Sequence, residues 1–128
     1  MIKIGIIGFG VVGKAAANTL SKNFDLVIYD KFHSHDDFGD LNTCKFVFIA
    51  VPTPFDCKTN RIDDSAVIES LKNLEKIGYS EIVIIKSTVP PGSCKKYLSK
   101  FNFRMVFNPE FLRESTTPNE DFKNQEII

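Results

Sequence analysis

The chain has 128 residues, of which 43% are hydrophobic and 25% charged, a composition typical of one soluble globular domain. Sixteen basic residues balance sixteen acidic ones; residues 1–64 sum to −1 and residues 65–128 to +1, so neither half offers a field for nucleic acid or an anionic membrane. No apolar run approaches the ~20 residues of a membrane-spanning helix. The three cysteines form no CxxC motif, which favours a reduced, cytoplasmic protein.

Short apolar runs alternate with helical patterns along the chain. Continuous apolar runs such as residues 46–51 are typical of strands buried on both faces of a parallel sheet. The helical spacing is clear where Val67, Leu71 and Leu74 form one stripe before Gly78. In chain order we predict a strand over residues 2–7, a helix over 11–22, strands over 26–29 and 46–51, a helix over 65–77, a strand over 82–85, a short helix from about 93 to 100, and a strand over 104–107.

This order of elements predicts an α/β fold. The sheet should be Rossmann-like, doubly wound and mostly parallel, with helices on both faces in three αβα layers. Residues 31–45 are too few, and too rich in Asp, Gly and His, for a full crossover helix, so we expect a loop or a single turn there. Residues 125–128 look like the opening of a sixth strand. We therefore expect residues 1–128 to be a single domain, cut short at this strand and taken from a longer protein.

A glycine-rich loop joins the first predicted strand to the first helix. It reads Gly8-Phe9-Gly10-Val11-Val12-Gly13, the GxGxxG spacing of dinucleotide-binding folds. There the first glycine makes the turn, the second lets backbone N–H groups reach a pyrophosphate, and the third lets helix and strand pack closely. Asp30, 20 residues after Gly10, could accept hydrogen bonds from an adenine ribose and repel a 2′-phosphate, which predicts NAD rather than NADP. The alternative is a turn needed only for packing, with Asp30 as a capping residue.

Three further segments each follow a predicted strand, and so lie at the carboxyl edge of the sheet, where open α/β folds bind ligands. Singly, they could be proline turns that end strands, with Arg113 in a surface ion pair with Glu110 or Glu114. The segments are Val51-Pro52-Thr53-Pro54, Lys86-Ser87-Thr88-Val89-Pro90-Pro91-Gly92 and Asn108-Pro109-Glu110-Phe111-Leu112-Arg113-Glu114. Together, and in this order, they resemble the N-terminal NAD-binding domain of the UDP-glucose/GDP-mannose dehydrogenase family.

The resemblance implies an NAD-dependent oxidoreductase that oxidises the C6 alcohol of a nucleotide sugar, such as UDP-glucose, in two steps to a carboxylate. It implies three catalytic residues: Thr88 to position a water, Glu110 as an acid or base, and Glu114 beside nicotinamide and sugar. Glu110 and Glu114 would share a face if their segment turned helically. The implied substrate contacts are Glu110, Phe111, Leu112, Arg113 and Glu114. The implied cofactor contacts are Gly8, Phe9, Gly10, Val11, Val12, Gly13, Asp30, His35 (where members often carry a basic residue near the phosphates), Val51, Pro52, Thr53, Ser87, Thr88, Val89 and Glu114.

Other reactive side chains have weaker signals. In the family, the cysteine that carries a thioester intermediate lies in a later domain, beyond residue 128. Cys94 could be a thiol activated near a helix N-terminus, but a buried helix residue is the expected alternative. His33 and His35 could suggest a metal site, yet their spacing fits zinc poorly, so we expect a solvated loop and assign no metal ligand.

The functional expectation is an NAD-binding domain that does not turn over substrate alone. Three alternatives stay open: a non-catalytic nucleotide-binding or assembly module, half of a split enzyme, and a different Rossmann dehydrogenase. The expected partners are NAD and a nucleotide sugar, without nucleic acid or membrane. An unpaired sheet edge at residues 103–107 also predicts a homo-oligomer or a complementing chain.

Overall fold

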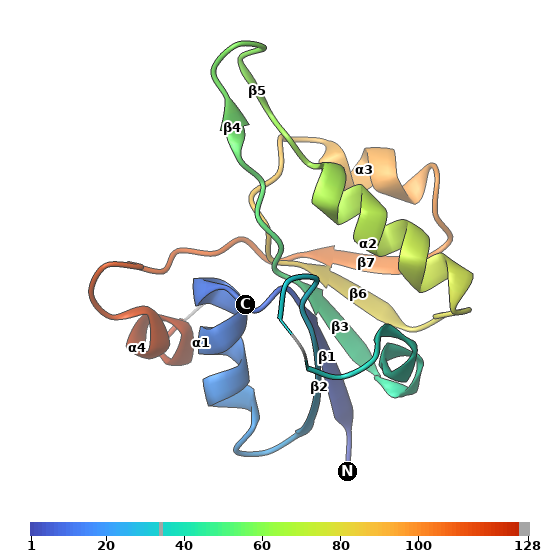
Figure 1. Cartoon of the computed structure of the whole chain (residues 1–128), viewed down its shortest axis with the longest axis vertical. Coiled ribbons are helices and arrows are strands. Elements are labelled where there is room, and N and C mark those ends of the chain that lie inside the picture. The colour runs from blue at the N-terminus through green and yellow to red at the C-terminus, as the bar shows by residue number, and fades with distance from the viewer. Residues whose placement is uncertain (34, 126–128) are drawn as a thin grey trace.

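A sheet of five parallel strands forms the centre of the molecule. The structure, a computed structural model, describes residues 1–33 and 35–125. The strands are β1 (Lys3–Ile7), β2 (Asp25–Tyr29), β3 (Phe46–Ile49), β6 (Ile82–Ile85) and β7 (Arg104–Phe107), in the spatial order β2-β1-β3-β6-β7. All four pairings between them are parallel, so the predicted α/β sheet is confirmed (Figure 1).

The chain winds outward from the middle of the sheet in both directions. The flanking helices are α1 (Val11–Leu20), α2 (Ser65–Lys76), α3 (Ser93–Leu98), α4 (Pro118–Lys123) and the 3-10 helix η1 (Phe38–Thr43). Helix α1 carries the chain from β1 to β2, whereas α2 and α3 carry it from β3 to β6 and then to β7. The direction therefore reverses between β1 and β3. A crevice at the carboxyl ends of such strands is where open α/β sheets bind ligands.

Hydrophobic side chains pack on both faces of the sheet. Ile6 and Ile7 fall into different cores, because successive side chains of a strand point to opposite faces. The larger core packs Ile7 with Leu71 of α2 and with residues of η1 and α3. The smaller core packs Ile6 with Ala16 of α1, and Phe122 of α4 lies against it. The predicted three layers are therefore present.

The two edges of the sheet differ. At the β2 edge, the Asp36 N–H donates to the Ile28 carbonyl over 2.9 Å, and the Asp36 carboxylate accepts from the Ile28 N–H over 2.7 Å. These two bonds occupy backbone groups that a neighbouring strand would otherwise use. At the other edge, β7 has no outer neighbour within the described residues, and Val106 and Phe107 are 51% and 45% exposed. Most of the predicted sixth strand, residues 126–128, lies outside the described residues.

One hairpin of two strands and one helix were not predicted. Strands β4 (Phe55–Asp56) and β5 (Arg61–Ile62) form an antiparallel hairpin that projects from the body at the top of Figure 1. Helix α4 packs beside α1. The described residues of 31–45 form no α-helix, as predicted, but the 3-10 helix η1 has six residues, about two turns rather than the single turn expected. Within residues 1–33 and 35–125, no helix is both long and apolar enough to span a membrane.

Candidate functional site

A cavity of about 540 Å³ lies at the carboxyl edge of the sheet. The glycine loop, α2 and the segments that follow β2, β3, β6 and β7 form its walls. Most of the predicted site residues line it: Gly8, Phe9, Gly10, Val11, Val12, Asp30, Val51, Pro52, Thr53, Ser87, Thr88, Glu110, Leu112 and Glu114. Segments far apart in the sequence thus meet in one place, as expected for parallel strands that end at a common edge.

The other predicted site residues are not among those that line the cavity. Gly13 is buried in α1, and Val89 is buried in the larger core. The His35 ring packs edge-on against Phe9, with ring centroids 4.7 Å apart. Phe111 is exposed. The structure does not bring these side chains to the cavity, and neither does it bring Arg113 there.

The expected geometry of the segment after β7 needs two corrections. Arg113 pairs with Asp121 of α4 at 2.7 Å, rather than with Glu110 or Glu114. The hydrogen bonds from Arg113 lower the pKa of the Asp121 carboxyl. Residues 108–113 have no regular secondary structure, so Glu110 and Glu114 do not share a helix face.

The glycine loop is built as its spacing predicts. Gly8 has a φ of +96°, and a Cβ atom there would lie 2.5 Å from the Ala50 carbonyl oxygen, so only glycine fits. A Cβ at Gly13 would lie 2.0 Å from the Gly8 oxygen, which confirms the close contact between helix and strand. Gly10 is different, because nothing lies within 4 Å of its Cβ position. It opens a cradle at the N-terminus of α1, where N–H groups and the helix dipole favour an anion.

The Asp30 carboxylate is held by three hydrogen bonds. It accepts from the Phe9 N–H at 2.7 Å, from the Phe32 N–H at 2.9 Å and from the His33 ring at 2.9 Å. Burial raises the pKa of Asp30, but these hydrogen bonds outweigh it and lower the pKa to about 2. Asp30 is therefore an ionised acceptor in the cavity wall at the end of β2, and it also caps the turn that follows, as the alternative interpretation expected.

A buried ion pair lies in another part of the cavity wall. The Lys86 ammonium, just after β6, is 2.8 Å from Glu110 Oε2, and the two side chains are only 1% and 7% exposed. Lys86 also donates to Asn108 Oδ1 at 2.5 Å. Glu110 Oε1 accepts from the Phe111 N–H at 3.0 Å and from the Gln125 side chain. The carboxylate is therefore held from both sides.

The segment after β6 is tied to the end of β3. The Ser87 hydroxyl donates to the Val51 carbonyl at 2.7 Å, and the Ser87 N–H donates to the Ile49 carbonyl at 3.1 Å. Ser87 is buried, whereas Thr88 is exposed at the cavity wall. The bonds of Ser87 therefore fix the backbone that presents the Thr88 hydroxyl to the cavity.

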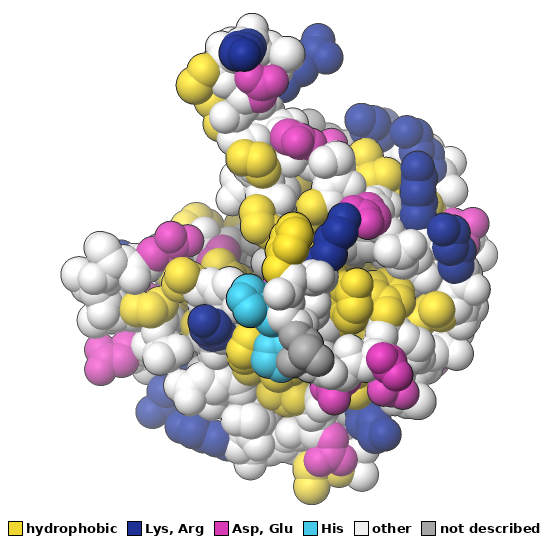
Figure 2. Space-filling model, viewed as in Figure 1, with side chains coloured by type: hydrophobic (Ala, Val, Ile, Leu, Met, Phe, Trp, Pro, Cys, Tyr) yellow, Lys and Arg dark blue, Asp and Glu magenta, His cyan; other side chains and the backbone are white. Residues whose placement is uncertain are grey.

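Several residues that line the cavity have no role predicted from the sequence. Lys86 is the first residue of the segment that follows β6, but its pairing with Glu110 depends on β6 and β7 being neighbours. Helix α2 contributes a stripe whose three-to-four spacing could have shown a common face: Ala66, Glu69, Ser70 and Asn73. The space-filling view of Figure 2 shows the two histidines next to each other at the surface.

The arrangement suits an elongated ligand that carries both hydroxyl and phosphate groups. One part of the cavity offers the ionised Asp30 as an acceptor for hydroxyl groups, and Gly10 leaves room for phosphates beside the N-terminus of α1. Another part offers carboxylates and a hydroxyl group from Glu110, Glu114 and Thr88. These residues fit a dinucleotide that lies across the crevice.

Residues 30–128 match the UDP-glucose/GDP-mannose dehydrogenase family, NAD binding domain. The chain belongs to this family. As members named UDP-glucose 6-dehydrogenase, the protein of Campylobacter jejuni is 31% identical over 161 aligned positions, and that of Streptococcus pneumoniae is 40% identical over 72. These alignments cover 99% and 56% of this chain, but only 41% and 18% of the relatives. The chain thus spans less than half the length of either dehydrogenase.

Solved structures support the same fold. An imine reductase from Bacillus cereus BAG3X2 superposes with a TM-score of 0.66 at 13% identity, covering 90% of this chain and 43% of the reductase. An imine reductase from Aspergillus terreus, solved with NADPH4 and dibenz[c,e]azepine, gives a TM-score of 0.65 at 10% identity with the same coverage. At these identities the likeness shows the fold alone. The cofactor implied for this chain by its dehydrogenase family is NAD.

Proposed function

We propose that this chain is the cofactor-binding part of an NAD-dependent dehydrogenase that oxidises the C6 alcohol of a nucleotide sugar such as UDP-glucose, in two steps, to a carboxylate. One observation carries the proposal. A single cavity joins the glycine loop and Asp30 to Thr88, Glu110 and Glu114. A cofactor and a reacting group could therefore meet inside it.

The residues of the loop and of β2 would hold the cofactor. Gly10 and the first N–H groups of α1 would face the pyrophosphate, and the Asp30 carboxylate would accept hydrogen bonds from the adenine ribose. Thr53, Ser87 and Thr88 would lie beside the rest of the cofactor. When bound, NAD supplies the acceptor for the hydride that leaves the alcohol carbon.

Glu110, Glu114 and Thr88 would perform the proton chemistry. Glu110 is the candidate acid or base, and Glu114 is the candidate contact to sugar and nicotinamide. The product carboxylate would form by hydrolysis of a thioester intermediate. That step needs a side-chain carboxylate to take a proton from water and a hydroxyl group to orient the water. Glu110 and Thr88, which could do this, line the same cavity. Leu112, also in the wall, would contact the substrate.

The test is cofactor binding by two matched glycine variants. Gly10 and Gly39 both have open space at the Cβ position, so alanine at either leaves the fold intact, but only Gly10 lines the cavity. We expect Gly10→Ala to lose NAD⁺ binding in a calorimetric titration and Gly39→Ala to keep it. Equal binding by both variants, or stronger binding of NADP⁺ than of NAD⁺ by the unmodified chain, would contradict the proposal.

We also propose that the chain works in the cytoplasm and associates with a copy of itself or with a complementing chain. The cysteine pattern supports the location. The exposed Val106 and Phe107 beside the open β7 edge support association. Light scattering coupled to size exclusion across a dilution series tests this; a monomer at high concentration would count against it.

A further inference from the structure

Lys86 and Glu110 are one electrostatic unit. Their charged atoms are 2.8 Å apart, and almost none of either side chain reaches solvent. Two opposite charges that are buried together stabilise each other, whereas one buried charge without a partner is strongly unfavourable. The pair is therefore two opposite charges that sum to zero in the cavity wall.

Neighbouring residues leave the pair little freedom. Asn108 accepts a second hydrogen bond from Lys86, and the Phe122 ring lies under the ammonium with its centroid 5.3 Å away. Gln125 and the Phe111 N–H hold the other oxygen of Glu110. The charges are fixed in place, and they are screened little by salt because they are buried.

The order of the strands indicates which half of a dinucleotide lies near the pair. Asp30 directly follows β2, on one side of the crevice, and Gly10 lies at the crevice itself. With the adenine ribose on Asp30 and the pyrophosphate at Gly10, the rest of an extended dinucleotide runs toward the ends of β6 and β7. Lys86 and Glu110 lie there, so the nicotinamide half is the part nearest to them.

We propose that Lys86 cancels the charge of the Glu110 carboxylate beside the nicotinamide, so that this pair gives the cavity no electrostatic preference between NAD⁺ and NADH, an inference that rests on the proposed cofactor site. The nicotinamide ring carries a positive charge in NAD⁺ and none in NADH, so a net charge nearby changes the two affinities unequally. The balanced pair favours neither form. Lys86 is thus a positioning residue, which holds the Glu110 carboxylate beside the ring and cancels its charge.

The experiment measures the dissociation constants of NAD⁺ and NADH for the 128-residue chain, by calorimetry and by NADH fluorescence. The variants are Lys86→Met, Glu110→Gln and the double variant, with Lys45→Met as a control at the opposite end of the sheet. We expect Lys86→Met to change the ratio of the two affinities about fivefold in favour of NAD⁺, because a negative charge is left near the ring. Glu110→Gln should change the same ratio about fivefold in favour of NADH, because a positive charge is left there. The double variant and Lys45→Met should have nearly the same ratio of affinities as the unmodified chain.

The possible results separate this inference from the proposed function. If each single variant changes both affinities by the same factor, the pair is only structural and the inference is wrong. If Lys86→Met does not fold, Glu110→Gln still decides, because in that variant the Lys86 ammonium keeps its hydrogen bond to Asn108 and its contact with the Phe122 ring. An unmodified chain that binds neither NAD⁺ nor NADH would overturn the proposed function, and the inference with it.

Discussion

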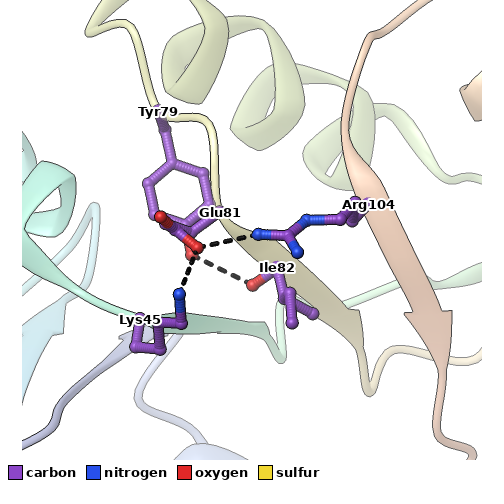
Figure 3. Close-up of polar contacts among 5 residues, drawn as sticks. All are labelled: Lys45, Tyr79, Glu81, Ile82 and Arg104. Atoms are coloured by element: carbon purple, nitrogen blue, oxygen red, sulfur yellow. Dashed lines mark hydrogen bonds and ion pairs between the residues drawn. The ribbon is translucent and has the colours of Figure 1, made fainter.

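Ion pairs lie at both ends of the same strands, in opposite environments. At the amino ends, Glu81 lies between Lys45, before β3, and Arg104, the first residue of β7, at 2.8 and 2.9 Å (Figure 3). Their side chains are 52%, 35% and 64% exposed for Lys45, Glu81 and Arg104. At the carboxyl ends, Lys86 and Glu110 are almost completely buried.

The difference in burial between the two groups of ion pairs indicates that they have different roles, one in the fold and one in the cavity. Exposed pairs gain little, because water and salt screen them and because long side chains lose freedom. Glu81 bridges the starts of neighbouring strands, and the Tyr79 hydroxyl donates to the Ile82 carbonyl beside it at 3.0 Å (Figure 3). A buried pair is often no better than apolar residues for stability, so its presence beside a cavity suggests a role in that cavity.

The largest effect on stability is expected from Lys86→Met. It leaves Glu110 buried without a counter-charge, and the free energy of unfolding should fall by about 3–5 kcal/mol. The double variant Lys86→Met with Glu110→Gln should recover most of this loss, because no charge is then left unpaired. Urea unfolding of the three proteins measures it. A double variant no more stable than the single one would show that the charges are not coupled.

A smaller effect is expected at Asp30, through pH. The pKa of Asp30 is about 2 in the folded chain and nearer its ordinary value when unfolded. The folded state therefore binds fewer protons between these values; the stabilisation is complete above about pH 4 and lost as the pH falls toward 2. After allowance for solvent screening it amounts to about 1–2 kcal/mol.

The variant Asp30→Asn tests this assignment. Urea unfolding at pH 6, 4, 3 and 2 should show a difference between variant and unmodified chain that shrinks as the pH falls. A difference that is constant across this range would rule out Asp30 as its source.

The smallest effect is expected at the amino ends. The hydrogen bond from Lys45 lowers the pKa of the Glu81 carboxyl, but the group is open to solvent. We expect Glu81→Gln to reduce the unfolding midpoint slightly in low salt and hardly at all in high salt, with NAD⁺ binding unchanged. A loss of stability as large as that expected for Lys86→Met would show that the exposed ion pairs and the buried pair do not differ in their contribution to stability.

The sequence predicted the elements that repeat a strong pattern. The five parallel strands are short, mostly apolar runs, continuous in β3 and β6, and α2 has an apolar stripe with Gly78 after it. The glycine loop and Asp30 were predicted because the tight turn and the close approach of helix to strand leave few choices of residue.

Two of the missed features lack a local pattern or depend on distant contacts, whereas a third had local signals. Each strand of the β4–β5 hairpin has only two residues, too few for a periodicity. Helix α4 did carry signals: Pro118 in its first turn and acidic residues after it. The pairing of Lys86 with Glu110 could not be predicted from the residues near either one, because it requires β6 and β7 to be neighbours.

The hydrogen bonds of Asp30 have a consequence for the kinetics of ligand exchange. A carboxylate offers about four lone-pair sites, and three donors already occupy Asp30. A diol brings two more, so one donor must leave. The backbone N–H groups of Phe9 and Phe32 are fixed by the chain, whereas the His33 side chain is 70% exposed. Its departure is a rotamer change of an exposed side chain, which takes picoseconds to nanoseconds. Association at this end of the cavity should therefore follow diffusion, without a slow conformational phase in stopped-flow traces.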